Sequence, residues 1–162
     1  MKVYYQTFVI VFLLILGLLF VLPSQLFADG GGGSSTVQPV DPDIDHANQA
    51  IKDKNWSKAI DHLNLAIARD DRNAEAYNLK GYSERMSGNL DAAFKDYERA
   101  LELDPKHRGA HEYIGEAYLM VDNLVKAEEH LAVLDKLCFF PCEEYTDLKD
   151  AIGDYKAKRG HP

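Results

Sequence analysis

A repeat with a period of 34 residues is the feature that most constrains how this chain can fold. Segments of similar character begin at Lys54, Gly88 and Asp122, which lie 34 residues apart each time. Each unit carries small or apolar residues at helical spacing in two runs separated by a polar turn, and this pattern predicts a pair of packed amphipathic helices. The residues that align across the three units are Asn55, Asn89 and Asn123; Ala59, Ala93 and Ala127; Leu63, Tyr97 and Leu131; Ala66, Ala100 and Leu134; and Ala47, Gly81 and Gly115.

The central unit resembles the tetratricopeptide repeat (TPR). The positions that match the pattern of that family are Tyr77, Gly81, Ala93, Tyr97, Ala100 and Pro105. The resemblance covers about residues 40–139, and the positions that depart from the family pattern are Asp71, Lys80, Glu84 and Phe139. It implies an all-α solenoid of about three repeats within residues 43–139, at approximately 40–73, 74–107 and 108–141.

Residues 142–158 are predicted to form one more amphipathic helix. Its apolar stripe is Tyr145, Leu148, Ile152 and Tyr155, whereas the residues expected to face water are Glu143, Glu144, Lys149 and Lys156. A stack of repeats leaves its last apolar face open, and a terminal helix with a polar outer side covers that face. The sequence therefore predicts a C-terminal capping helix.

The first 28 residues have the pattern of a secretory signal peptide. Lys2 precedes an uncharged apolar run at residues 8–22, and the predicted cleavage follows Ala28. Leu26 is larger than the residue preferred two positions before a cut, so an uncleaved N-terminal membrane anchor is the alternative. In both cases the rest of the chain is exported, because Lys2 is the only charge before Asp29 and positive charge stays inside.

Residues 29–42 are predicted to be a flexible linker, since a stretch rich in Gly, Ser and Pro cannot bury apolar surface. Folded structure is then expected to begin near residues 43–46. The chain has 18 basic and 26 acidic residues and a formal net charge of −8. This balance argues against nucleic acid as a partner, because phosphate binding needs clustered Lys and Arg.

Cys138 and Cys142 are the only cysteines of the chain. Residues four apart at a helix end have α-carbons about 6 Å apart, which a disulfide tolerates, and export supplies oxidising conditions. The favoured prediction is a structural disulfide that fixes the angle between the third repeat and the capping helix. Three alternatives stay open: a redox-active thiol pair, which Glu143 and Glu144 oppose, a copper site with His130 as a poorly placed third ligand, and buried free thiols.

Other residues give weak signals of chemistry. His107 and His111 have the spacing of metal ligands but are interpreted as surface histidines, and His62 and His130 share a repeat position that is expected to be exposed. The sequence shows no Gly-rich phosphate loop, no nucleophile with a plausible base and no clustered carboxylate pair. It therefore predicts no enzyme, no cofactor and no metal site.

In the TPR family the first helices of the repeats line a concave groove that binds peptides or helices, and the resemblance implies such a groove here. The residues that it places in the groove are Asn48, Glu75, Asn78, Tyr82, Arg85, Glu112, Glu116 and Leu119. The glutamates would favour a partner segment with Lys or Arg and one apolar anchor. Alternatively, they are the solvated side of ordinary helices. One TPR subtype clamps the carboxylate end of cytosolic chaperones, but Ile44 and Gly109 stand where its basic residues belong, so we reject that partner.

Together these patterns predict an exported three-repeat adaptor, released or anchored near a membrane, that binds another envelope protein. The tail at residues 137–152 also resembles that of small exported bacterial repeat proteins, which favours the periplasm. The alternative is a small thiol-redox or copper-binding module that uses Cys138 and Cys142 for chemistry and the repeats for docking. Self-association through the groove or the cap is a third option, and the sequence predicts neither the partner nor the oligomeric state.

Overall fold

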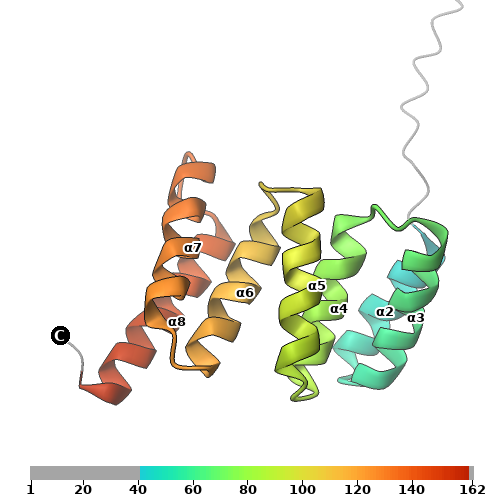
Figure 1. The fold of residues 1–162 in the computed structure, drawn as a ribbon, viewed down its shortest axis with the longest axis horizontal. Helices are drawn as coiled ribbons and strands as arrows, with labels where there is room; N and C mark the ends of the chain where they lie inside the picture. Colours follow the sequence, from blue (N-terminus) through green and yellow to red (C-terminus); the bar gives the residue numbers. More distant parts are fainter. Residues whose placement is uncertain (1–40, 161–162) are drawn as a thin grey trace, which may run out of the picture. The chain divides into compact units, whose positions relative to one another are not determined.

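The computed structural model describes residues 41–160, and within this range the chain forms seven α-helices and no strand (Figure 1). The helices are α2 (Pro42–Lys52), α3 (Trp56–Arg69), α4 (Ala74–Met86), α5 (Leu90–Leu103), α6 (Arg108–Met120), α7 (Leu124–Leu137) and α8 (Glu143–Arg159). The predicted signal peptide at residues 1–28 and nearly all of the predicted linker lie outside the described residues. The all-α class predicted from the repeat is confirmed for the described range.

Asparagine side chains start several of these helices. Asn55, Asn73 and Asn123 each precede a helix, and their side-chain oxygens accept a hydrogen bond from the backbone N–H three residues further on. Such a bond satisfies one of the backbone donors that the first turn of a helix leaves unpaired. Two of the three asparagines occupy the same repeat position, so the 34-residue period fixes where the second helices begin.

The turn inside each repeat has the same backbone conformation in all three units. Lys54, Gly88 and Asp122 occupy equivalent positions and have φ angles of 55°, 90° and 62°. Positive φ is free of steric cost only for glycine. Gly88 therefore suits this turn, whereas Lys54 and Asp122 adopt the same conformation at some steric cost. The repeat therefore governs the backbone as well as the side-chain pattern.

Contacts between helices place the first helix of every repeat on one side of the stack. α2 packs on α3, α4 on α5 and α6 on α7, which gives three helical pairs. Between repeats, α2 contacts α4 and α4 contacts α6, whereas α3, α5 and α7 do not contact one another in this part of the chain. The first helices thus form the inner layer of a curved stack and the second helices form its outer layer.

Residue size is matched across each helical pair. Tyr97 is fully buried on α5, and a Cβ added to Gly81 on α4 would lie only 2.7 Å from its ring. At the equivalent positions of the first repeat, Ala47 faces inward on α2 and Leu63 on α3, and both are fully buried. The smaller residue on the first helix therefore faces the larger residue on the second helix, because two helices at close approach leave a fixed volume between them.

The C-terminal helix α8 lies within one residue of the span predicted for the cap, 142–158. It packs against both α6 and α7. Leu148 is fully buried there, and a Cβ added to Gly115 on α6 would lie 2.7 Å from its side chain. The inner layer thus continues from α6 to α8, which closes the apolar face of the third repeat.

The first helix begins at Pro42, slightly before the start that was predicted near residues 43–46. Asp41 caps this helix, and its carboxylate accepts a hydrogen bond from the backbone N–H of Asp43 at 2.8 Å. Proline is favoured in the first turn because its missing N–H would be unpaired there in any case. Residues 41 and 42, which were assigned to the linker, therefore belong to the first helix and its cap.

Candidate functional site

The main candidate site is an acidic cleft that α4, α6 and α8 line together. Its volume is about 340 Å³. The lining residues are Glu75, Asn78 and Leu79 from α4, His107 from the turn before α6, Gly109, Glu112 and Tyr113 from α6, and Glu143, Glu144 and Asp147 from α8. The cleft lies on the inner helices, and half of the residues around it carry a carboxylate.

Two of these carboxylates have basic partners. Glu75 pairs with His107, whose Nε2 lies 3.0 Å from its Oε2, and this pair raises the pKa of His107. Glu144 pairs with Arg108, whose Nε lies 3.5 Å from its Oε1. Glu144 was predicted to face water, and that prediction is wrong because the first turn of α8 rests against the start of α6. Both pairs lie at the edge of the cleft and leave its floor without a matching cation.

Glu112 forms the acidic floor of the cleft. Its residue is 8% exposed, and no ion pair within residues 41–160 involves it. Burial raises the pKa of its carboxyl group to about 8, and the negative charges of Glu116, Asp147 and Glu144 add to this effect, while Arg85 opposes it. The raised pKa means that ionisation of this carboxyl group is unfavourable in the cleft, and a cation bound beside it would favour the ionised form.

Asn78, which also lines the cleft, has an unused hydrogen-bond acceptor. The residue is 3% exposed, and its Nδ2 donates to Oε2 of Glu75 at 3.3 Å. Its Oδ1 is buried and has no hydrogen-bond partner among the described residues. An unpaired buried acceptor is costly, so such a group is expected to have a function when it lines a cleft. Gly109 lets α6 approach this amide closely, since a Cβ there would lie 3.2 Å from Nδ2 of Asn78.

An aromatic cluster borders the cleft, with Tyr82 and Tyr113 on inner helices and Trp56 at the start of the outer helix α3. Tyr82 lies between Trp56 and Tyr113, with ring centroids 6.0 Å and 5.0 Å away. The guanidinium of Arg85 lies over the Tyr82 ring at 5.4 Å, and its Nη2 is 2.7 Å from Oε2 of Glu116. Arg85 is thus held by stacking and by an ion pair, and its positive charge opposes the rise in the pKa of Glu112.

The eight residues that the resemblance placed in the groove separate into four groups. Three of them line the cleft: Glu75, Asn78 and Glu112. Three form the neighbouring aromatic and charged cluster: Tyr82, Arg85 and Glu116. Leu119 instead packs in the core cluster that joins α6, α7 and α8, and Asn48 is half-buried on α2, outside the cleft lining.

Four further residues with a carboxylate or a phenol ring line the cleft but were not predicted as groove residues. Tyr113 follows Glu112 on α6, and Glu143, Glu144 and Asp147 come from the cap. The repeat pattern gives no signal for the last three, because α8 lies outside the repeat. A cap that continues the inner layer brings its first turn to the groove, and only the packing of α8 on α6 reveals this.

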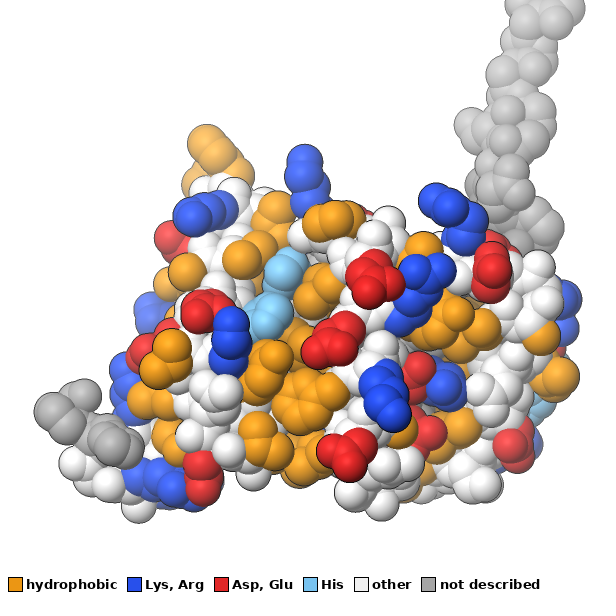
Figure 2. Space-filling view, in the orientation of Figure 1, with side chains coloured by type: hydrophobic (Ala, Val, Ile, Leu, Met, Phe, Trp, Pro, Cys, Tyr) orange, Lys and Arg blue, Asp and Glu red, His pale blue; other side chains and the backbone are white. Residues whose placement is uncertain are grey.

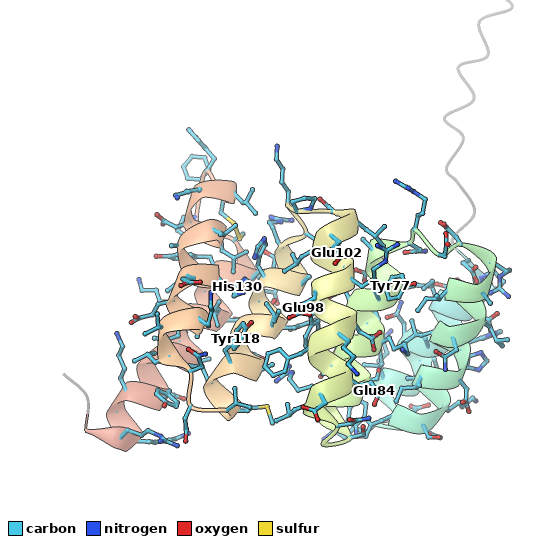
Figure 3. The ribbon with its side chains drawn as sticks, viewed as in Figure 1. Tyr77, Glu84, Glu98, Glu102, Tyr118 and His130 are labelled. Carbon is cyan, nitrogen blue, oxygen red and sulfur yellow. A yellow bond between two sulfur atoms is a disulfide. The ribbon has the colours of Figure 1, made fainter. Side chains whose placement is uncertain are left out.

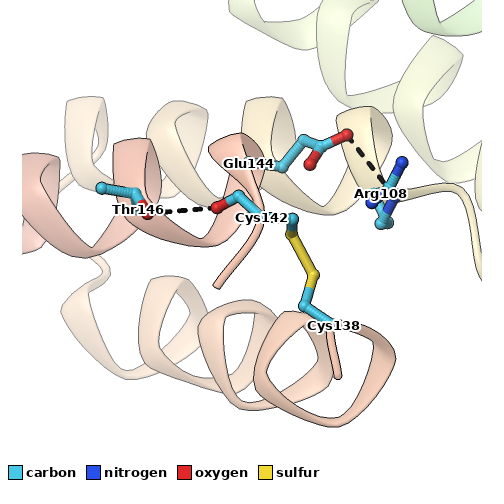
Figure 4. The surroundings of a disulfide bond; sticks show 5 residues. All are labelled: Arg108, Cys138, Cys142, Glu144 and Thr146. Carbon is cyan, nitrogen blue, oxygen red and sulfur yellow. Dashed lines mark hydrogen bonds and ion pairs between the residues drawn. A yellow bond between two sulfur atoms is a disulfide. The ribbon is translucent and has the colours of Figure 1, made fainter. Parts of the chain in front are cut away.

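Cys138 and Cys142 are joined by a disulfide whose α-carbons are 5.8 Å apart (Figure 4). Cys138 ends α7 and Cys142 precedes the first residue of α8. The Oγ1 of Thr146 donates to the backbone carbonyl of Cys142 at 3.1 Å. The bond therefore fixes the start of α8, next to the two cleft carboxylates Glu143 and Glu144.

The histidines depart from their predicted exposure. His111 is buried, and its Nε2 lies 3.1 Å from the carbonyl oxygen of Pro105, which can only accept. Its Nδ1 must then accept the hydrogen bond from Nδ1 of His130, 2.9 Å away. Burial lowers the pKa of both rings, to about 4 for His130, where His111 adds to the effect. The pair lies among hydrophobic side chains over α6 and α7, where His130 stacks on Tyr118 (Figures 2 and 3).

His62 and His107 are also less exposed than predicted. Nδ1 of His62 lies 2.6 Å from Oδ1 of Asp43, and His107 pairs with Glu75 as described above. All four histidines lie where the two helices of a repeat, or two neighbouring inner helices, meet. A repeat position that looks polar on a helical wheel can still be covered by the partner helix.

Residues 74–107, the central unit, match the tetratricopeptide repeat family. The fold of the described residues is a TPR-like solenoid. A TPR repeat-containing protein of Rhizobium etli is 32% identical over 78 residues, which are 48% of this chain and 37% of that protein. The chain thus spans well under two thirds of the length of this relative.

Solved structures with the same fold include two that were determined in complex with a partner. The Yersinia enterocolitica type III secretion chaperone SycD, in complex with a peptide of the translocator YopD, has a TM-score of 0.64 at 17% identity. The match covers 73% of this chain and 92% of that one. The TPR2B domain of yeast Sti1, in its complex with pHsp70, has a TM-score of 0.63 at 15% identity over 73% and 96% of the two chains. At these identities the likeness concerns the fold.

No helix in residues 41–160 is long and apolar enough to cross a membrane.

Proposed function

We propose that this protein is an exported TPR adaptor whose acidic cleft binds a basic segment of another envelope protein. The observation that carries the proposal is the lining of the cleft, which includes both the carboxyl group of Glu112 and Asn78, whose buried Oδ1 has no hydrogen-bond partner among the described residues. An ammonium or guanidinium group would ionise the first and donate a hydrogen bond to the second.

The partner segment is expected to carry Lys or Arg next to an apolar side chain. The cation enters the cleft between α4, α6 and α8, where Glu75, Glu112 and Asp147 surround it. The apolar side chain contacts Tyr82 and the neighbouring aromatic rings. A SycD complex with a YopD peptide supports the choice of a peptide segment as ligand, because its fold is the same.

The acidic cleft makes a chaperone carboxylate an unsuitable ligand. Ile44 is buried in the first core cluster, and Gly109 brings no side chain to the cleft. These are the positions where the carboxylate-clamping TPR subtype has basic residues. A terminal carboxylate would meet five acidic side chains here, which disfavours its binding electrostatically.

Export and localisation belong to the same proposal. The apolar run at residues 8–22 and the small residue Ala28 support secretion with cleavage after Ala28, or anchoring by the uncleaved run. A disulfide between Cys138 and Cys142 suits the periplasm, where disulfides persist. The adaptor would then act in the envelope, released or tethered by residues 29–40.

Peptide binding to the full chain tests the proposal. The probes are fluorescent peptides with one apolar anchor and either Lys or Glu beside it, and the readout is fluorescence anisotropy at increasing salt. We expect the Lys peptides to bind, and Glu112→Gln to weaken them about tenfold or more, since a neutral amide cannot form the charge pair. Affinity should fall with salt.

Glu98→Gln is the matched control, because Glu98 is an exposed carboxylate on the outer helix α5 (Figure 3). It removes the same charge far from the inner layer and should leave affinity unchanged. Equal binding of Lys and Glu peptides, or equal losses in the two variants, would contradict the acidic cleft as the site.

One double variant distinguishes the adaptor from the alternative function, a thiol-redox or copper-binding module. Cys138→Ser with Cys142→Ser should leave an adaptor that still binds the Lys peptides at some loss of stability. A redox or copper module would lose its activity entirely, which is measured as thiol oxidation or as copper retained after dialysis. In the structure both sulfurs are occupied by each other, which favours the adaptor.

A further inference from the structure

Three side chains converge on the seam between α2 and α3, at the end of the solenoid away from the cap. Oδ1 of Asp43 lies 2.6 Å from Nδ1 of His62 and 3.8 Å from Nδ1 of His46. The three ligand atoms all lie within 4.8 Å of one another, and this is the one such group of His, Cys, Asp or Glu side chains found in residues 41–160. The seam thus brings together two imidazoles and a carboxylate.

The distances suit a small tetrahedral metal centre. Ligand bonds of about 2.0–2.1 Å to Zn²⁺ in a tetrahedron place neighbouring ligand atoms about 3.3 Å apart. The two measured distances to Asp43 lie on either side of this value, so small side-chain rotations would equalise them. The His46 side chain is 64% exposed and free to make its part of that adjustment.

The equivalent positions of the other repeats explain why an external cation fits only here. In the central repeat, Lys80 and Asp96 stand where His46 and His62 do, and Nζ of Lys80 lies 3.0 Å from Oδ1 of Asp96. That seam carries its own cation. In the third repeat the buried Ile114 replaces His46 and packs in the core cluster with Tyr97 of α5, so this position offers no ligand atom. The first repeat instead has an imidazole at this position, and its own cation, Arg69, pairs with Oδ2 of Asp43 and not with the oxygen that faces the histidines.

A second layer of contacts orients the carboxylate. The guanidinium of Arg69 pairs with Oδ2 of Asp43, which leaves Oδ1 directed at the histidines. Nε of Arg69 also donates to Oδ2 of Asp41 at 2.9 Å. Partners that hold a ligand from behind in this way are typical of metal sites. Asp41 and Asp43 together outweigh the one charge of Arg69, so the local charge favours a dication.

We propose that Asp43, His46 and His62 bind a borderline divalent cation of the Zn²⁺ type, with the fourth coordination position open to water. Imidazole nitrogens with one carboxylate suit Zn²⁺ and its first-row neighbours and disfavour Mg²⁺ and Ca²⁺, which take oxygen ligands. The ion joins α2 to α3 and strengthens the repeat that has no neighbour before it in the described part of the stack. This inference does not depend on the acidic cleft.

Isothermal titration of the full chain with Zn²⁺, without a histidine tag and with the disulfide intact, tests the site. We expect one equivalent of Zn²⁺ to bind near neutral pH and no heat of binding with Mg²⁺. His46→Ala should reduce the affinity about tenfold or more, because it removes one of three ligands. Since this side chain is mostly exposed, the variant should fold like the parent, as judged by its thermal midpoint without metal.

Asp45→Ala is the matched control, because it removes an exposed negative charge from the same turn of α2 without removing a ligand. It should leave the Zn²⁺ affinity nearly unchanged. Zn²⁺ should also raise the thermal midpoint of the parent and of Asp45→Ala but not that of His46→Ala. Unchanged Zn²⁺ affinity in His46→Ala would overturn the proposal, because the ion would not be bound by this side chain. A loss of affinity in His130→Asn instead would also overturn it, because the ion would then lie at the His111–His130 pair.

Discussion

Glu112 shows how the surroundings of one residue set its chemistry. On a helical wheel it is an ordinary glutamate of α6, but burial and three acidic neighbours raise the pKa of its carboxyl group to about 8. The folded state therefore keeps a proton there that the unfolded chain releases near its ordinary value of 4.5. Between these two values the folded state binds more protons, so its stability falls as pH rises.

Replacing this carboxyl group by an amide should remove the pH dependence that it causes. We expect Glu112→Gln to raise the free energy of unfolding by about 1–3 kcal/mol above pH 8, and to change it little below pH 4.5. Urea unfolding of both proteins at the two pH values measures the difference. Glu98→Gln should show no such contrast, and a loss of stability in Glu112→Gln above pH 8 would mean that the carboxylate is ionised and well paired.

Size matching between Gly81 and Tyr97 is a second feature that belongs to single residues. Gly81→Ala places a methyl group against a fully buried ring, and the strain should exceed the gain of about 1 kcal/mol from alanine in a helix. We expect a net loss of about 1–2 kcal/mol in the free energy of unfolding. Thermal or urea unfolding provides the measurement.

The first repeat supplies the control for this substitution, since it has Ala47 and Leu63 at the same two positions. Gly81→Ala combined with Tyr97→Leu copies that pair, so the two substitutions should be less harmful together than the sum of their separate effects. The double-mutant cycle gives the coupling energy. Simple additivity would show that the ring and the glycine are not packed as described.

At the scale of elements, α8 does more than cover the third repeat. Its buried residues Leu148 and Ile152 close the core, while its first turn gives Glu143, Glu144 and Asp147 to the cleft. The disulfide lies directly before that turn. Cap and binding surface are therefore mechanically connected through the start of one helix.

Removing the disulfide should loosen this turn without unfolding the solenoid. For so short a loop, the chain-entropy contribution is about 2 kcal/mol, so Cys138→Ser with Cys142→Ser should lower stability by that amount or less. Amide exchange should accelerate around residues 143–147 and stay slow in α4 and α5. Reducing agent added to the parent protein should have the same effect, and uniform acceleration along all helices would contradict a local role.

At the scale of the whole molecule, the N-terminal segment and the disulfide make one joint prediction. Protein isolated from its native envelope should have a mass that begins at Asp29, and it should be lighter than its reduced form by the two thiol hydrogens. It should react with a thiol alkylating agent only after reduction. A mass that includes residue 1 would favour the anchor, and free thiols would favour the redox or copper module.

Much of the fold follows from the repeat. The register of Ala59, Ala93 and Ala127 predicts the second helices, and the position of Asn55 and Asn123 predicts where they start. The cap was predicted from its apolar stripe to within one residue at each end. These features depend on local backbone preferences and on helical periodicity, and both are determined by residues that are close together in the sequence.

The candidate sites were only partly predictable. The resemblance to the TPR family implied a groove with Glu75, Asn78 and Glu112, which line the cleft in the structure, but it gave no indication of the contribution from α8. The repeat pattern also treated the histidines as surface residues. Periodicity indicates which face of a helix a residue occupies, but it does not identify the side chain that lies opposite on another helix.

The sequence by itself determined the helical pairs, their spacing, their caps and the presence of a terminal helix. Only the tertiary structure decided which polar groups meet: Asp43 with His62 and His111 with His130, each 19 residues apart. It also decided that the pKa of Glu112 is raised, because that pKa depends on burial and on charges from two other helices. Periodicity is a local property of the chain, whereas desolvation and charge pairing exist only after the helices have packed.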